Sequence, residues 1–183
     1  MQRDDVAADA SVARFFRDHC SGSREAFLRA WNVPILVQMS QPTPTPKTPF
    51  HTTPSFGTLI MNARDGGLSS MGPVSIHPLA KRDNNPFAAM ITVGRAPNND
   101  IVLAYDEVSK FHAFFLRTAG GWALVDAHST NGTFLGGRRI KPPEPYQIDL
   151  GSGFVEVAFS GILAVVYAPE RLYELAQTGT LVA

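Results

Sequence analysis

The chain has 183 residues and a mass of 19.8 kDa, with 44% hydrophobic and 17% charged residues. This size leaves room for one domain with extensions, and the hydrophobic content is too high for a wholly disordered chain. Sixteen basic residues balance sixteen acidic ones, and this zero net charge argues against a general nucleic-acid binder, which needs a basic excess. Since no apolar run approaches the roughly 20 residues that span a bilayer and the N-terminus is polar and acidic, we expect a cytoplasmic protein without membrane contact.

The first part of the chain has a helical pattern. Apolar residues between positions 8 and 31 recur at three- and four-residue spacings, and a Ser-Gly-Ser run at 21–23 divides them into two short helices, the second capped by a serine. A strand is expected at 35–39. Five prolines and five threonines follow between Pro42 and Pro54, and this composition indicates an extended linker or strap.

These shifts divide the chain into a helical N-terminal extension (1–40), a Pro/Thr-rich linker (41–56) and a β-rich domain (57–183). From about residue 71 onward, short strands follow one another with frequent turns, among them the hairpin signals Gly120-Gly121 and Gly136-Gly137. Because no helix separates these strands, the pattern predicts an antiparallel sandwich or barrel. The expected strands are 35–39, 74–78, 90–93, 101–103, 113–116, 122–125, 134–135, 139–140, 154–159 and 162–167, and a last helix begins at Pro169.

Polar residues at three predicted loop tips form a candidate anion site. Arg95 is an always-charged planar donor that matches a phosphate or a carboxylate, and Lys110 adds a second positive charge. Ser109 and Thr130 contribute hydroxyl donors. Asn131 can donate and accept at once, which suits the backbone of an extended peptide. Together these residues form a site for a dianion with a peptide clamp beside it.

Three motifs in this region resemble the forkhead-associated (FHA) domain in order and spacing. They are Gly94-Arg95, Ser109-Lys110-Phe111-His112 and Ser129-Thr130-Asn131-Gly132-Thr133. The resemblance covers a core of about 74–166, half of the chain. It implies an all-β fold, an eleven-stranded FHA-like β-sandwich with its binding loops at one end, here with a short α-helical N-terminal extension and a C-terminal helix.

The resemblance also implies residue roles. Arg95 and Ser109 would grip the phosphate of a phosphothreonine, Lys110 and Thr130 would add contacts, and Asn131 would hold the peptide backbone. The residues that would support the site structurally are Gly94, His112 and Gly132. The implied protein is a non-catalytic adaptor in Ser/Thr kinase signalling, of bacterial style, without cofactor or metal. Its partner would be a phosphothreonine protein that is a kinase substrate or itself a kinase, and its oligomeric state stays open.

Two other classes of protein, a scaffold and an enzyme, are alternatives to this interpretation. The protein could be a scaffold that binds an unmodified partner through a sheet face or through its N-terminal aromatic residues. An enzyme would have to use Ser109, His112 and Asp126 as a triad, but the chain lacks a Gly-x-Ser-x-Gly elbow.

Glu107, just before the second motif, would disfavour acidic residues in a bound peptide. The four Thr-Pro pairs between 43 and 54 are candidate phosphorylation sites that a copy of the chain could bind.

Overall fold

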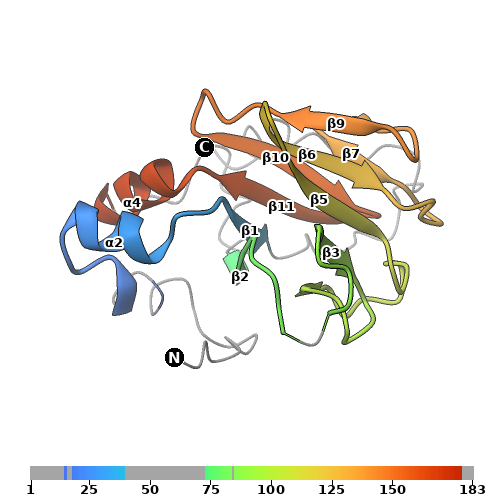
Figure 1. Cartoon of the computed structure of the whole chain (residues 1–183), viewed down its shortest axis with the longest axis horizontal. Helices are drawn as coiled ribbons and strands as arrows, with labels where there is room; N and C mark the ends of the chain where they lie inside the picture. The colour runs from blue at the N-terminus through green and yellow to red at the C-terminus, as the bar shows by residue number, and fades with distance from the viewer. Residues whose placement is uncertain (1–14, 16–17, 40–72, 84, 179–183) are drawn as a thin grey trace, which may run out of the picture.

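The computed structural model describes residues 15, 18–39, 73–83 and 85–178 (Figure 1). The Pro/Thr-rich stretch with its Thr-Pro pairs and most of the first predicted helix lie outside the described residues. Within them, eleven strands form two facing sheets, as the resemblance implied. In the six-stranded sheet the order is β2 (Pro73–Pro78), β1 (Ile35–Met39), β11 (Ile162–Tyr167), β10 (Phe154–Phe159), β7 (Thr133–Leu135), β8 (Arg138–Arg139). In the five-stranded sheet it is β4 (Ile101–Val102), β3 (Met90–Gly94), β5 (Ala113–Thr118), β6 (Gly121–Asp126), β9 (Pro145–Ile148).

Most neighbouring strands are antiparallel, and one pair is an exception. β3 and β4 run parallel, with Val93 opposite Ile101 and Gly94 opposite Val102. The connection between them (95–100) therefore doubles back, so that β4 begins beside Val93 and forms the edge of the sheet next to β3. The sandwich predicted from the sequence as antiparallel therefore includes one parallel pair.

The main core fills the space between the two sheets. Phe115 of β5 and Phe159 of β10 are fully buried there, and their rings meet edge to face with centroids 6.4 Å apart. Such a pairing adds roughly 0.5–1.5 kcal/mol to the contribution of buried area. Because β5 alternates buried and partly exposed residues, its inner side chains anchor the strand while its outer ones face away from the core.

A second core covers the outer face of the six-stranded sheet. The helices α2 (Arg24–Ala30) and α4 (Pro169–Thr178) lie beside each other next to this sheet (Figure 1). The hydroxyl of Tyr173 donates to the Gly22 carbonyl at 3.0 Å, which ties α4 to the N-terminal segment. β11 lies between both cores, so all six of its residues are buried and the strand has a continuous apolar run.

The N-terminal aromatic residues Phe15 and Phe27 belong to this second core. Phe15 is 4% exposed and Phe27 is 2% exposed, so neither offers a surface to a partner. As predicted, a serine caps the second N-terminal helix: Ser23 accepts a hydrogen bond from the amide of Ala26 at 3.2 Å. None of the helices in the described ranges has the length and apolar character needed to cross a membrane.

Two strand predictions need correction. β9 (Pro145–Ile148) was not predicted, because its short run begins with proline and its residues are mostly exposed. β8 was predicted at 139–140 and spans Arg138–Arg139. The glycine pair before it, Gly136 and Gly137, has φ angles of +55° and +75° and forms a two-residue turn as predicted, so β8 begins directly after it, one residue earlier than the apolar pattern suggested.

Candidate functional site

Three loops meet at one end of the sandwich. β5 begins and β6 ends at this end, because Ala113 pairs with Asp126. The loops are β3–β4 (95–100), β4–β5 (103–112) and β6–β7 (127–132). They carry every residue that the sequence assigned to the anion site.

The first two loops are joined through their backbones. The amide of Arg95 donates to the Ser109 carbonyl at 3.1 Å, and that of Ala96 donates to the Lys110 carbonyl at 3.2 Å. The buried Asn99 amide side chain reinforces this contact by donating to Lys110 O at 2.7 Å. Arg95 is thereby fixed at its backbone next to Ser109, while its side chain is exposed.

Gly94 permits this close approach. A Cβ atom there would lie 2.9 Å from Asn99 Nδ2 and closer still to the Lys110 carbonyl oxygen. Real Cβ atoms do not come this close to backbone atoms, so any side chain would push the two loops apart. Gly94 therefore sets the separation of Arg95 from the Ser109–Lys110 segment.

The second and third loops meet at two hydroxyl groups. The Thr130 amide donates to Ser109 Oγ at 3.1 Å, and Ser109 Oγ lies 3.4 Å from Thr130 Oγ1. Thr130 is exposed and Ser109 is half-buried. Because an N–H group uses Ser109 Oγ as its acceptor, the Ser109 hydroxyl proton is available to an acceptor in the site.

Asn131 extends from the third loop back to the second. Its Nδ2 donates to the Glu107 carbonyl at 2.9 Å, and the same carbonyl accepts from Ser160 Oγ at 2.6 Å. These bonds fix the backbone of Glu107. One side of the exposed Asn131 amide is thus engaged within the protein, which holds the residue in position beside Thr130.

His112 lies fully buried beneath the loops. The Ser109 amide donates to its Nδ1 at 3.1 Å, so the ring carries its proton on Nε2 and donates to the Gly132 carbonyl at 3.2 Å. Burial lowers the pKa of His112, against the opposing effects of the Gly132 carbonyl and Asp126. A neutral ring therefore bridges the loops that carry Ser109 and Asn131.

Asp126 organises the third loop from below. It accepts hydrogen bonds from Ser129 N at 3.0 Å, Ser129 Oγ at 2.5 Å and Thr133 Oγ1 at 2.6 Å. Burial alone would raise the pKa of Asp126, but the bonds from Ser129 and Thr133 together with His112 outweigh it and lower the pKa. From the sequence, Asp126 was considered only as a possible member of a catalytic triad. The hydroxyl residues three and seven positions later, Ser129 and Thr133, are the sequence signal for its supporting role, because both donate to its carboxylate.

These contacts do not form a catalytic relay. His112 bonds Ser109 through the Ser109 backbone amide, its other nitrogen faces Gly132, and Asp126 is bonded to Ser129 and Thr133. The site instead presents exposed hydrogen-bond donors and two cationic side chains, Arg95 and Lys110. The loops that carry them are held in place by the bonds of His112 and Asp126 beneath. Such a surface can bind a dianion.

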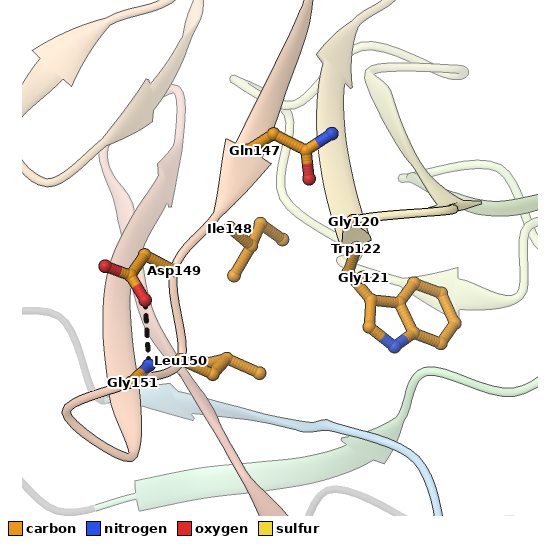
Figure 2. A pocket seen from close by; sticks show the side chains of 8 residues that line it. All are labelled: Gly120, Gly121, Trp122, Gln147, Ile148, Asp149, Leu150 and Gly151. Carbon is orange, nitrogen blue, oxygen red and sulfur yellow. Dashed lines mark hydrogen bonds between the residues drawn. The ribbon is translucent and has the colours of Figure 1, made fainter.

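A separate apolar hollow lies at the opposite end of the sandwich (Figure 2). It is lined by Trp122 near the β5–β6 turn, by Ile148 at the end of β9 and by Leu150 after it. Asp149 Oδ1 accepts from the Gly151 amide at 2.8 Å and closes the turn beside it (Figure 2). None of the residues predicted to bind phosphate lies there.

Part of this chain is similar to known proteins. A sequence model of the FHA domain matches residues 91–155. The transcriptional regulatory protein EmbR of Mycobacterium tuberculosis is 31% identical over 115 residues, which cover 62% of this chain and 29% of that protein. An ABC transporter ATP-binding/permease protein of the same species is 42% identical over 50 residues, or 27% of this chain and 6% of that protein. This chain therefore matches well under half of either relative.

Among solved structures, similarity is found to Mycobacterium tuberculosis EmbR in complex with a low-affinity phosphopeptide. The TM-score is 0.40 and the identity 23%, over 51% of this chain and 22% of that chain.

Proposed function

We propose that this chain, which contains an FHA domain, binds proteins that are phosphorylated on threonine. The observation that supports this most directly is the convergence of Arg95, Ser109 and Thr130. The Arg95 amide bonds the Ser109 carbonyl, and the Thr130 amide bonds the Ser109 hydroxyl. The residue that carries the guanidinium and the two that carry hydroxyl groups thus meet at the junction of the three loops.

The physical basis is the charge of the phosphate. Phosphorylation adds about 1.5 to 2 negative charges and three acceptor oxygens to a threonine. Arg95 would pair with this charge, the Ser109 and Thr130 hydroxyls would donate to the oxygens, and Lys110 would add attraction from the adjoining residue. Asn131 would hold the peptide backbone beside the phosphothreonine. A charge-assisted contact of this kind contributes roughly 1.5–3 kcal/mol, so each one lost should weaken binding about tenfold or more.

The same arrangement favours an adaptor over an enzyme. His112 is buried and engaged on both nitrogens, so it is not placed to activate a nucleophile. We infer that the protein acts by binding, as an adaptor in Ser/Thr kinase signalling. Its partner would be a kinase substrate or a kinase that carries phosphothreonine.

The test is a titration of an oriented phosphothreonine peptide library against wild-type protein, Arg95→Ala and Arg117→Ala. Arg117 is the matched control because it is an exposed cation of β5 whose guanidinium lies 5.4 Å from the centre of the Trp122 ring, at the end away from the loops. We expect Arg95→Ala to lose at least about tenfold in affinity and Arg117→Ala to bind like wild type. If the wild-type protein binds no phosphopeptide, the proposed function is wrong.

A further inference from the structure

Two large hydrophobic side chains are exposed in the described part of the chain, and they lie against each other. Phe87 is 46% exposed and Phe111 is 37% exposed, and their rings stack with centroids 5.7 Å apart at 14°. Phe111 stacks in turn on Phe114, at 5.9 Å and 5°. We call this row of nearly parallel rings, Phe87, Phe111 and Phe114, the aromatic ladder.

The ladder is held in place by a buried polar network. Asp100, 6% exposed, accepts from the Arg82 amide at 2.8 Å, from Lys81 Nζ at 3.0 Å and from Asn85 Nδ2 at 2.7 Å. Asn85 Oδ1 then accepts from the Phe87 amide at 3.0 Å. Lys81, Arg82 and Asn85 are thereby fixed to the sheet, and Phe87 is held at its backbone while its ring is exposed.

The outer face of the five-stranded sheet supports the other end of the ladder. Phe114 lies opposite Thr92 in the pairing of β5 with β3, so the two side chains share one face. Thr92 is buried and its amide donates to Asp100 at 2.8 Å. The network that fixes Phe87 therefore also lies beside Phe114, and a ligand would meet rings whose positions are already set.

The ladder adjoins the proposed phosphate site directly. Phe111 follows Lys110, whose carbonyl accepts from the Ala96 amide at 3.2 Å, and Arg95 bonds the backbone of Ser109 in the same way. The backbone segment that fixes Arg95 therefore continues directly into Phe111, so the ladder begins one residue after Lys110 of the proposed phosphate site. The backbone of Glu107, earlier in the same loop, is instead held by Asn131 and Ser160, which both donate to its carbonyl.

We propose that the aromatic ladder binds a large apolar side chain, aromatic or branched aliphatic, of the same ligand whose phosphothreonine occupies the adjoining site. This inference rests on the proposed function. Two exposed rings are too small a surface for a stable dimer, which needs on the order of 800 Å² on each partner. They are large enough to cover one side chain, and this would add sequence preference to a site that otherwise reads the phosphate and the peptide backbone.

The test uses phosphothreonine peptides whose flanking positions are set one at a time to Phe, Leu or Ala, titrated by fluorescence anisotropy. The proteins are wild type, Phe111→Ser, Phe87→Ser and Leu150→Ser. Leu150 is the matched control, since it is a partly exposed apolar residue of the hollow at the far end (Figure 2). Thermal unfolding of each variant establishes that it is folded, and Phe87→Ser serves alone if Phe111→Ser does not fold.

We expect one flanking position at which Phe or Leu binds the wild type about tenfold more tightly than Ala. Phe111→Ser and Phe87→Ser should lose this advantage and Leu150→Ser should keep it, while the all-Ala phosphopeptide binds all four proteins alike. The inference is wrong if no position shows the advantage, or if both ladder variants retain it. It is also wrong if the variants change only the self-association of the protein in sedimentation, since the ladder then binds a second copy. Failure of the proposed function looks different, because no phosphopeptide would then bind the wild type.

Discussion

Ser109 and Thr130 meet across two loops that are 21 residues apart in the chain, with the Thr130 amide donating to Ser109 Oγ at 3.1 Å. This single bond couples the β4–β5 loop to the β6–β7 loop at the exposed surface. Because Ser109 Oγ is the acceptor in this bond, its own proton can be donated to a ligand or to Thr130 Oγ1, which lies 3.4 Å away. One side chain thus links the loops and offers a donor to a ligand.

Ser109→Ala should therefore weaken phosphopeptide binding more than it weakens the fold. The variant removes a donor to the phosphate and the acceptor for the Thr130 amide, so we expect about tenfold lower affinity and a loss of about 1 kcal/mol in the free energy of unfolding. Calorimetric titration and urea unfolding measure the two quantities. Ser152→Ala, which removes an exposed hydroxyl at the far end, is the control; equal affinity of the two variants would contradict the role of Ser109.

Gly94→Ala should destabilise the site through crowding. Its Cβ atom would meet the Lys110 carbonyl and displace the Asn99 amide that bonds it, so the Arg95 backbone would move away from its partner loop. We expect a loss of about 1–3 kcal/mol in the free energy of unfolding, with weaker phosphopeptide binding. Gly161→Ala is the matched control, because a Cβ at this turn has no neighbour within 4 Å. Similar unfolding curves for both variants would count against a packing role for Gly94.

Much of this fold is predictable because it depends on local periodicity. The alternation in Phe154–Phe159 and the apolar run of Ile162–Tyr167 became the strands β10 and β11. β9 was missed since it is stabilised by pairing with β6 rather than by its own short sequence. The dual burial of β11 depends on α2 and α4 covering the outer face, and no window of residues contains that information.

The site shows the same division between local and distant information. Arg95 and Ser109 were found because their motifs have a typical order and spacing. The stacking of Phe87 on Phe111 was not foreseen, because these residues are 24 positions apart, with β3 and β4 between them in the chain. The supporting role of Asp126 was not predicted, since the sequence does not show which groups donate to its carboxylate.

Stability should decrease as the pH falls below about 6.5. The buried His112 has a lowered pKa, and burial together with Arg82 lowers the pKa of His77 to about 4. Both rings take up protons in the unfolded chain near the ordinary value of 6.5 and resist protonation when folded. Their contribution is therefore complete above about pH 6.5 and is lost as the pH falls towards the folded-state values.

Urea unfolding between pH 7.5 and pH 4.5 measures this slope, and His77→Gln tests its origin. In His77→Gln the free energy of unfolding should decrease less steeply as the pH falls. His112→Gln should have the same effect and should in addition weaken phosphopeptide binding, because it disturbs both loops. A slope that is unchanged in His77→Gln would show that this histidine does not control the pH dependence.

Asp126→Asn should loosen the third loop, although Asp126 is not one of the residues proposed to contact the ligand. The carboxylate accepts from Ser129 N, Ser129 Oγ and Thr133 Oγ1, and Ser129 Oγ in turn accepts from the Gly132 amide at 3.0 Å. An asparagine in this place turns an NH₂ group towards groups that donate, so at least one bond to a charged acceptor is lost. We expect a loss of about 2 kcal/mol in the free energy of unfolding.

The carboxylate of Asp149 provides the comparison. It is exposed at the far end and accepts one bond, from the Gly151 amide, so Asp149→Asn should change the stability by less than about 1 kcal/mol and leave phosphopeptide binding unchanged. In Asp126→Asn the loop that carries Thr130 and Asn131 loses its support, and the affinity should fall together with the stability. Wild-type affinity in a destabilised Asp126→Asn protein would mean that the loop keeps its binding geometry without the carboxylate, and that the bonds made by Ser109, His112 and the Glu107 carbonyl suffice to position Thr130 and Asn131.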